Sequence, residues 1–221
     1  MKVLFYDVFK DNKSILDAPP ELLAKENQFA WAATKNEETD RFFPIIADDG
    51  DLLRGAVVHL GGYKSYDQAV EHVNNVPWVT HGVSDGFFYV YGNFKSVELL
   101  FNQDGKYAYQ NLDPMNRLQP FTTDPTVTWY VVVEAKDPST YDENHGIGDA
   151  VGCFRLLKGG IAEEVYDIES PNRKGKILRI KANFRAEVEQ YARELSSAQS
   201  ADAAVVILRT KPTSVWDFCF F

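Results

Sequence analysis

The chain has 221 residues, of which 45% are hydrophobic and 25% are charged, and its formal net charge at pH 7 is -9. A chain of this length suits one large domain with a substantial core, so its composition excludes a wholly disordered protein. Its negative charge gives no general attraction to nucleic acid or to anionic membranes, and we expect neither as a partner.

The first sixty residues predict an opening strand, a short helix and three more strands. Asp17 followed by two prolines indicates the start of the helix. Pro44 favours an edge or bulge position for the strand that contains it, because proline cannot donate to the ladder. The predicted elements are a strand at 2–9, a helix that ends near residue 27, and strands at 28–34, 41–47 and 52–60.

Ser65 and Gln68 have the spacing of a capping box and predict the start of an amphipathic helix. The helix would place one apolar face inward, and Pro77 lies just beyond its end. Three strand-like segments follow at 86–92, 97–101 and 106–110, and an Asp-Gly pair between the last two indicates a tight hairpin. This part of the sequence is typical of an antiparallel meander.

Residues 111–126 carry three prolines without periodicity, which is typical of a boundary segment. We predict one domain over 1–221, with two lobes at 1–112 and 126–221 as the alternative. Beyond the boundary we expect a strand at 127–135, a long loop at 136–150, a hairpin of 151–157 with 162–169, a strand at 175–182, a second helix from Asn183, and a strand at 203–209. The spacing from 175 to 209 suits a parallel crossover.

These elements predict an α+β fold: a predominantly antiparallel β-sheet with two amphipathic helices packed on it and one short N-terminal helix. The two halves share a faint order of strand, helix and further strands, at 52–91 and at 175–221. No residue pattern repeats between them, so the sequence alone does not indicate a duplication.

Aromatic residues make up 14% of the chain, and they suggest contact surfaces. In a terminal strand Trp216, Phe218 and Phe220 point to one side, and three bare rings in a row would favour aggregation. We expect this strand to dock in the chain's own core or on a partner. Tyr89 and Tyr91 share a second aromatic face, which either packs on the first amphipathic helix or contacts a partner.

Candidates for chemistry are few. The four histidines His59, His72, His81 and His145 form no metal-binding motif, so we expect neither a metal nor a cofactor. Low-specificity candidates for catalysis are His81, His145, Asp149 and Arg54. Cys153 and Cys219 lie in apolar runs and are expected to be buried free thiols, with a mutual disulfide as the alternative.

The absence of a catalytic motif favours a non-enzymatic binding or assembly protein that acts through aromatic β surfaces. Examples are a virion subunit or an acidic inhibitor of a basic partner, with a protein or a second copy of the chain as the partner. The alternative is a small hydrolase or transferase with a site near His81, His145 and Asp149. The sequence has no signal peptide or transmembrane run, so we expect the cytoplasm or an intracellularly assembled particle.

Overall fold

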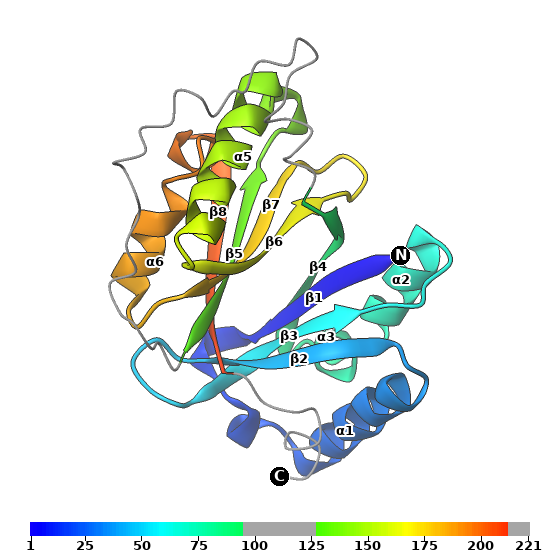
Figure 1. Ribbon diagram of the computed structural model, residues 1–221. Helices are drawn as coiled ribbons and strands as arrows, with labels where there is room; N and C mark the ends of the chain where they lie inside the picture. The colour runs from blue at the N-terminus through cyan, green and yellow to red at the C-terminus, as the bar shows by residue number, and fades with distance from the viewer. Residues whose placement is uncertain (95–126, 212–221) are drawn as a thin grey trace. The chain divides into compact units, whose positions relative to one another are not determined.

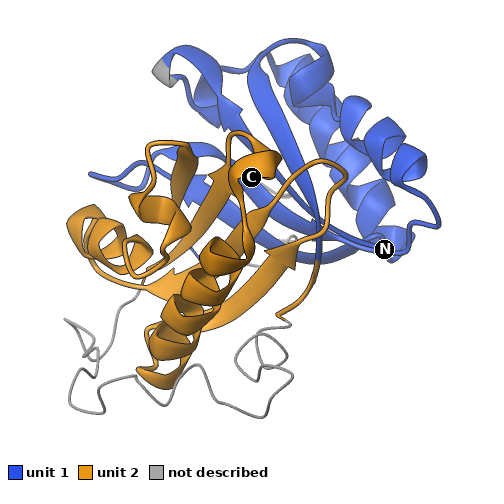
Figure 2. Cartoon of the chain, turned by 90° about the horizontal axis from the view of Figure 1, so that it is seen from above, with its two compact units in different colours: residues 1–91, 210–221 blue, residues 92–209 orange. Residues whose placement is uncertain are grey.

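The computed structural model describes residues 1–94 and 127–211. The chain divides into two units, shown in separate colours in Figure 2. Unit 1 comprises residues 1–91 and 210–221, and unit 2 comprises residues 92–209. The predicted strands at 97–101 and 106–110, the proline-rich segment and the terminal aromatic strand lie outside the described residues, and the predicted lobe boundaries stay a prediction.

Unit 1 is built on an antiparallel sheet in the order β4-β1-β3-β2. The strands are β1 (Lys2–Phe9), β2 (Thr39–Ile46), β3 (Leu53–Leu60) and β4 (Ser84–Asn93). The helices are α1 (Pro20–Lys35), α2 (Tyr66–Asn74) and the single turn α3 (Pro77–Thr80). All three helices lie on the same face of the sheet (Figure 1), where Val3, Phe5 and Phe9 of β1 pack against them.

Unit 2 has a sheet in the order β8-β5-β7-β6. Its strands are β5 (Thr128–Ala135), β6 (Ala162–Ile168), β7 (Gly175–Lys181) and β8 (Ala203–Thr210), and its main helices are α5 (Glu143–Lys158) and α6 (Arg185–Ala192). Strands β7 and β8 are the two strands that the predicted crossover connects. They lie on either side of β5, so they are not neighbours in the sheet. Trp129, Leu156 and Val188 belong to the core between this sheet and the helices.

The two units share one connectivity: strand, helix, two strands, helix, strand, with the first strand second in the sheet order. Their registers also correspond. Gly55 pairs with Val8 at one end of β1, and Gly175 pairs with Glu134 at the same point of β5. Both glycines have positive φ, 149° and 154°, and a Cβ on either would collide with a backbone carbonyl, of Asp7 in unit 1 and of Val133 in unit 2. Asp7 and Val133 are therefore equivalent positions.

The predicted fold class, α+β with mainly antiparallel strands, is confirmed. The first amphipathic helix is also found where it was expected, and the Ser65 hydroxyl caps it by accepting a 3.2 Å hydrogen bond from the Gln68 N–H. The Gln68 side chain accepts from the N–H of Lys64 rather than from that of Ser65, so the capping box is only half formed. Among the described residues, no helix is long and apolar enough to cross a membrane.

The prediction of a short first helix followed by a strand at 28–34 is wrong. Helix α1 continues to Lys35 because residues 20–33 contain no β-branched residue and several strong helix formers. Its inner face carries Leu22, Glu26 and Ala33, which are buried. This long helix therefore forms one wall of unit 1.

The predicted long loop at 136–150 and the strand at 151–157 are also wrong, because most of this region forms helix α5. Asp142 caps the helix by accepting a 2.9 Å hydrogen bond from the His145 N–H. Glycines hid the helix in the sequence, since glycine disfavours helix interiors. A Cβ on Gly152 would collide with the Glu194 carbonyl, so this glycine permits close packing of α5 on the segment after α6.

Candidate functional site

Unit 1 contains a pocket between its sheet and its helices. The wall is mainly apolar and comes from strands β1, β2 and β3 and from helices α1, α2 and α3, with the residue before α3. The lining residues are Phe5, Asp7, Phe9, Glu26, Phe29, Ala30, Ala33, Thr39, Phe42, Gly55, Ala56, Val58, Leu60, His72, Val76 and Trp78.

Asp7 is the acidic group of the pocket wall that comes from the sheet. Strand alternation places it on the helix-facing side with Phe5 and Phe9, and it is 3% exposed. Its Oδ1 accepts a 3.0 Å hydrogen bond from the Ala56 N–H, whereas its Oδ2 is buried without a hydrogen-bond partner. Burial raises the pKa of Asp7 to about 6, although the Ser84 hydroxyl and the Ala56 N–H lower it.

The Ser84 hydroxyl lies near the Asp7 carboxyl group but does not satisfy its free oxygen. The hydroxyl lies close enough to lower the Asp7 pKa, yet it makes no well-oriented hydrogen bond and is itself buried without a partner. Because hydrogen bonds weaken steeply when misaligned, Ser84 does not satisfy Asp7 Oδ2. One oxygen of the Asp7 carboxyl group therefore has no hydrogen-bond partner among the described residues.

Glu26 enters the pocket from α1 and is 8% exposed. Its Oε2 accepts a 3.1 Å hydrogen bond from the Trp78 N–H at the start of α3. Burial and the nearby charge of Asp7 raise the pKa of Glu26 to about 8. Near pH 7 the pair therefore carries one proton, with Asp7 mainly ionised and Glu26 mainly protonated, and each group titrates in the presence of the other.

His72 reaches the pocket from α2. Its ring packs against Phe29 and Tyr63, with ring centres 5.0 Å and 5.5 Å away, and its Nδ1 lies 3.7 Å from Glu38 Oε2. Burial lowers the pKa of His72 and outweighs the opposing effect of the Glu38 carboxylate. The histidine is therefore largely neutral at pH 7.

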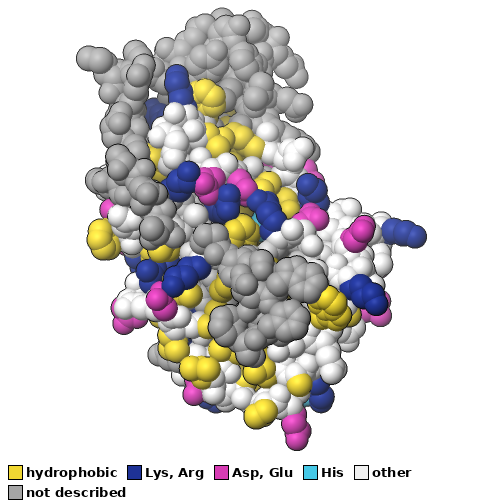
Figure 3. Space-filling model, turned by 60° about the horizontal axis from the view of Figure 1, so that its bottom comes forward, with side chains coloured by type: hydrophobic (Ala, Val, Ile, Leu, Met, Phe, Trp, Pro, Cys, Tyr) yellow, Lys and Arg dark blue, Asp and Glu magenta, His cyan; other side chains and the backbone are white. Residues whose placement is uncertain are grey.

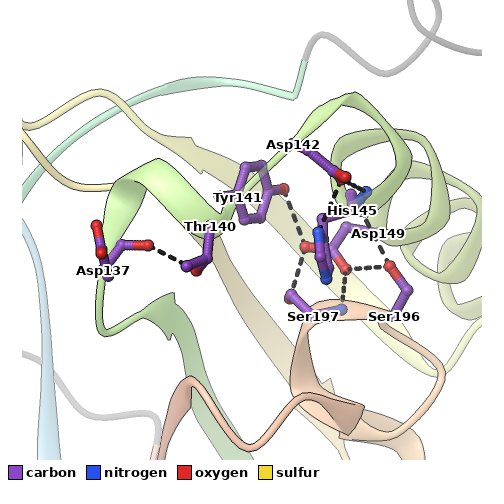
Figure 4. A network of polar contacts seen from close by, with 8 residues as sticks. All are labelled: Asp137, Thr140, Tyr141, Asp142, His145, Asp149, Ser196 and Ser197. Carbon is purple, nitrogen blue, oxygen red and sulfur yellow. Dashed lines mark hydrogen bonds and ion pairs between the residues drawn. The ribbon is translucent and has the colours of Figure 1, made fainter.

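Unit 2 also has a buried carboxyl group, and the side chains and backbone groups around it are shown in Figure 4. Asp149 on α5 is fully buried and accepts hydrogen bonds from the Tyr141 hydroxyl at 2.9 Å, the Ser197 N–H at 2.8 Å and the Ser197 hydroxyl at 2.7 Å. The Ser196 hydroxyl adds a longer contact of 3.4 Å. A carboxylate with this many donors ties α5 to the segment after α6 and has little capacity left for a ligand.

The predicted catalytic residues are divided between the two units, and a shared site for them stays a prediction. His81 and Arg54 belong to unit 1, whereas His145 and Asp149 belong to unit 2. His81 is exposed and caps the end of α3 through a 2.9 Å contact of its Nδ1 with the Pro77 carbonyl. His145 lies near Asp149 on α5, but its Nδ1 contacts Asp142 at 2.8 Å. These roles stabilise helix ends.

The predicted aromatic contact residues have different outcomes. Tyr89 and Tyr91 are 3% and 5% exposed, so neither offers an open platform, and they do not pack on α2. Val90, between them, packs on the helices, which places both tyrosines on the other face of the sheet. The contact role of Trp216, Phe218 and Phe220 stays a prediction outside the described residues.

Two further expectations concern sulfur and metal. Cys153 is a buried free thiol, as expected, while Cys219 lies outside the described residues. Within residues 1–94 and 127–211 there is no cluster of three or more histidine, cysteine or acidic side chains that could hold a metal ion. The pocket of unit 1 is thus defined by its carboxyl pair and its aromatic wall.

Sequence reasoning missed Asp7 and Glu26. The sequence did contain a signal for Asp7, which interrupts an apolar strand at a position facing the same side as Phe5 and Phe9. Glu26 gave no comparable signal, because the helix was expected to end one residue later. Only the full length of α1 shows that Glu26 faces inward.

Comparisons with known proteins identify the fold. No family model and no curated protein matches the sequence. Solved structures do match over 99% of this chain. Chlorite dismutase from Candidatus Nitrospira defluvii in complex with imidazole has a TM-score of 0.54 and 10% identity, over 93% of its own length. TA0507, a proposed chlorite dismutase, has a TM-score of 0.50 and 13% identity, over 98% of its own length. The chain therefore has the chlorite dismutase fold.

This likeness overturns the predicted function. A full-length match to chlorite dismutases contradicts a non-enzymatic binding or assembly protein such as a virion subunit or an inhibitor. The prediction failed because it treated the high aromatic content as an outer contact surface. In unit 1 many of these rings instead line the pocket or pack in the core. On the face seen in Figure 3, hydrophobic side chains lie in separate groups among charged ones.

Proposed function

We propose that this protein is an enzyme that moves protons on a small, largely apolar organic molecule bound in the pocket of unit 1. The observation that carries the proposal is the buried Asp7 of the pocket wall, whose Oδ2 lacks a hydrogen-bond partner. Leaving such an oxygen unpaired costs about 1–3 kcal/mol, so a ligand that donates to it would recover stability. The likeness to enzymes of the chlorite dismutase fold also favours catalysis.

The two carboxyl groups would divide the work. Asp7, ionised near pH 7, would accept a proton from an acidic C–H, N–H or O–H of the bound molecule. Glu26, protonated near pH 7, would return a proton to a second atom of the same molecule, so that the pair ends with one proton as it began. Two carboxyl groups whose surroundings separate their pKa values suit this division into base and acid.

The fold also raises heme as a cofactor, because proteins of this fold include heme-binding ones. The described residues do not fit it. In unit 2 the space between the sheet and helices is filled by buried side chains, and burial raises the pKa of Cys153, which disfavours a thiolate ligand. In unit 1 the histidine of the pocket packs against two rings, and two buried carboxyl groups share the pocket wall with it.

The test uses 5-nitrobenzisoxazole, a flat, apolar molecule that a carboxylate base converts to a coloured phenolate. The base removes the C–H proton, and the ring N–O bond breaks to give a nitrile. We expect turnover above the buffer rate that rises with pH through about 6, because the ionised form of Asp7 is the base. Asp7→Asn should lose this turnover.

Asp85→Asn is the matched control, since Asp85 is exposed at the start of β4 and pairs with Lys10 at 3.1 Å. It should leave the rate unchanged. Equal turnover by wild type and Asp7→Asn, or no turnover above buffer by the wild type, would overturn the proposal. Circular dichroism of each variant checks that the fold is retained.

A further inference from the structure

The described residues that can carry charge in the pocket of unit 1 are mainly acidic. Among the described residues that line it, none is lysine or arginine, and the titratable ones are Asp7, Glu26 and His72. Since burial disfavours the charged form of His72, the pocket carries a net negative charge whenever Asp7 is ionised. A bound anion would meet a buried carboxylate with no cation to offset it, which is strongly unfavourable.

Aromatic rings make up much of the remaining wall. Phe5, Phe9, Phe29, Phe42 and Trp78 all line the pocket. Phe9 and Trp78 contact each other edge to face, with ring centres 5.2 Å apart. The face of an aromatic ring carries partial negative charge and attracts cations, most strongly in the case of tryptophan. Rings together with an unpaired carboxylate are a common way to bind an organic ammonium group.

We infer that the ligand of this pocket is a small organic amine bound as its cation, with its N–H directed at Asp7 Oδ2 and its apolar part against the phenylalanine and tryptophan rings. The inference rests on the proposed function and names its substrate class. A neutral hydroxyl group could satisfy the same oxygen atom, but it would leave the buried negative charge unpaired. An ammonium group satisfies both the oxygen and the charge.

The experiment compares three molecules with one ring and three charges: benzylamine, benzyl alcohol and benzoate at pH 7. Binding is measured by calorimetry and by the NMR shift of the Trp78 backbone N–H, which donates to Glu26 inside the pocket. We expect benzylamine to bind at least about tenfold more tightly than benzyl alcohol, and benzoate not to bind, because a charge-assisted hydrogen bond and cation–π contacts favour only the amine.

Asp7→Asn separates the charge from the shape of the pocket, because it keeps the size of the side chain and an oxygen that can accept from Ala56. It should reduce benzylamine affinity about tenfold or more and leave benzyl alcohol affinity nearly unchanged. Asp85→Asn, which removes an exposed acid of the same unit, should alter neither. The two amide variants thus form a matched pair.

The outcomes distinguish the two proposals. If benzyl alcohol binds as tightly as benzylamine, or if Asp7→Asn leaves benzylamine affinity unchanged, the amine is not the ligand class, while a small-molecule site remains. If none of the three molecules shifts the Trp78 N–H signal, the pocket takes no ring of this size and the proposed function fails with the inference.

Discussion

Units 1 and 2 share their connectivity and register, yet equivalent positions carry a carboxyl group in unit 1 and an apolar side chain in unit 2. Asp7 in β1 and Val133 in β5 each place a backbone carbonyl against a positive-φ glycine and point a side chain toward the helices. Val133 is fully buried in a filled core, whereas Asp7 lines a pocket. A repeated topology therefore sets where a site can form, and one side chain decides whether it does.

The comparison extends to how each unit satisfies its buried charges. In unit 2, Asp149 has donors on both of its oxygens, and the buried Lys176 pairs with Asp167 on the neighbouring strand. In unit 1, Asp7 has a donor on one oxygen only. Paired buried charges rigidify a fold, while an unpaired one costs stability and persists where a function uses it. This difference assigns a structural role to the polar network of unit 2.

The largest effect is expected from giving unit 2 the residue of unit 1. Val133→Asp would bury a carboxyl group in a core without a pocket, and we expect it to lower the free energy of unfolding by about 4 kcal/mol or more. The reciprocal Asp7→Val would remove an unpaired oxygen but also the acceptor of the Ala56 N–H. These effects oppose each other, so its net change should be within about 1 kcal/mol.

Urea denaturation followed by circular dichroism measures both variants, with Val133→Thr as a control of nearly the same shape. The threonine hydroxyl should cost about 1–3 kcal/mol, less than the carboxyl group. If Val133→Asp were as stable as the wild type, unit 2 would contain unfilled space at this position and the contrast between the units would be wrong.

A smaller effect, dependent on pH, is expected from Glu26→Gln. The folded-state pKa of Glu26 is about 8 against 4.5 for an ordinary glutamate, so the folded protein binds more protons than the unfolded chain between these values. Stability therefore falls as pH rises from about 4.5 to 8, and the glutamine variant lacks this fall. Between pH 5 and pH 9 the variant should gain on the order of 3 kcal/mol relative to wild type.

Melting temperatures across this pH range provide the measurement, and Asp149→Asn is the unit 2 control. The amide cannot accept all the hydrogen bonds that Asp149 accepts, so this variant should be less stable than wild type at both pH 5 and pH 9. A Glu26→Gln difference that does not change with pH would mean that Glu26 titrates normally and that the pair does not hold a proton at pH 7.

Much of the fold could be predicted from local patterns. The opening strand at 2–9 and the helix capped by Ser65 follow from apolar periodicity and capping chemistry, which act over a few residues. Helix α5 could not be predicted in this way, because Gly152 is favoured by the close approach of Glu194, about forty residues away in the sequence. Local propensity contains no information on that contact.

The site was harder to predict than the fold because its members are spread over six elements. Asp7 alone gave a signal, as an acid within an apolar strand. Glu26 became a candidate only once α1 was seen to continue past it. In a sequence without a catalytic motif, histidines and acidic residues in predicted loops are the first candidates for a site. The pocket is instead formed by tertiary packing of residues that are distant in the sequence.

The smallest effect on stability is expected from filling the pocket itself. Ala30→Leu on α1 adds three carbon atoms next to open space, so stability should change by less than about 1 kcal/mol while benzylamine binding is lost. Ala150→Leu on α5 adds the same atoms to a fully buried position in unit 2 and should cost about 1–3 kcal/mol. Thermal melts measure the stability of both variants. Equal losses of stability would mean that unit 1 is packed as densely as unit 2. The combination of lost binding and retained stability in Ala30→Leu distinguishes a ligand pocket from a packing defect, since filling a mere defect would leave benzylamine binding unaffected.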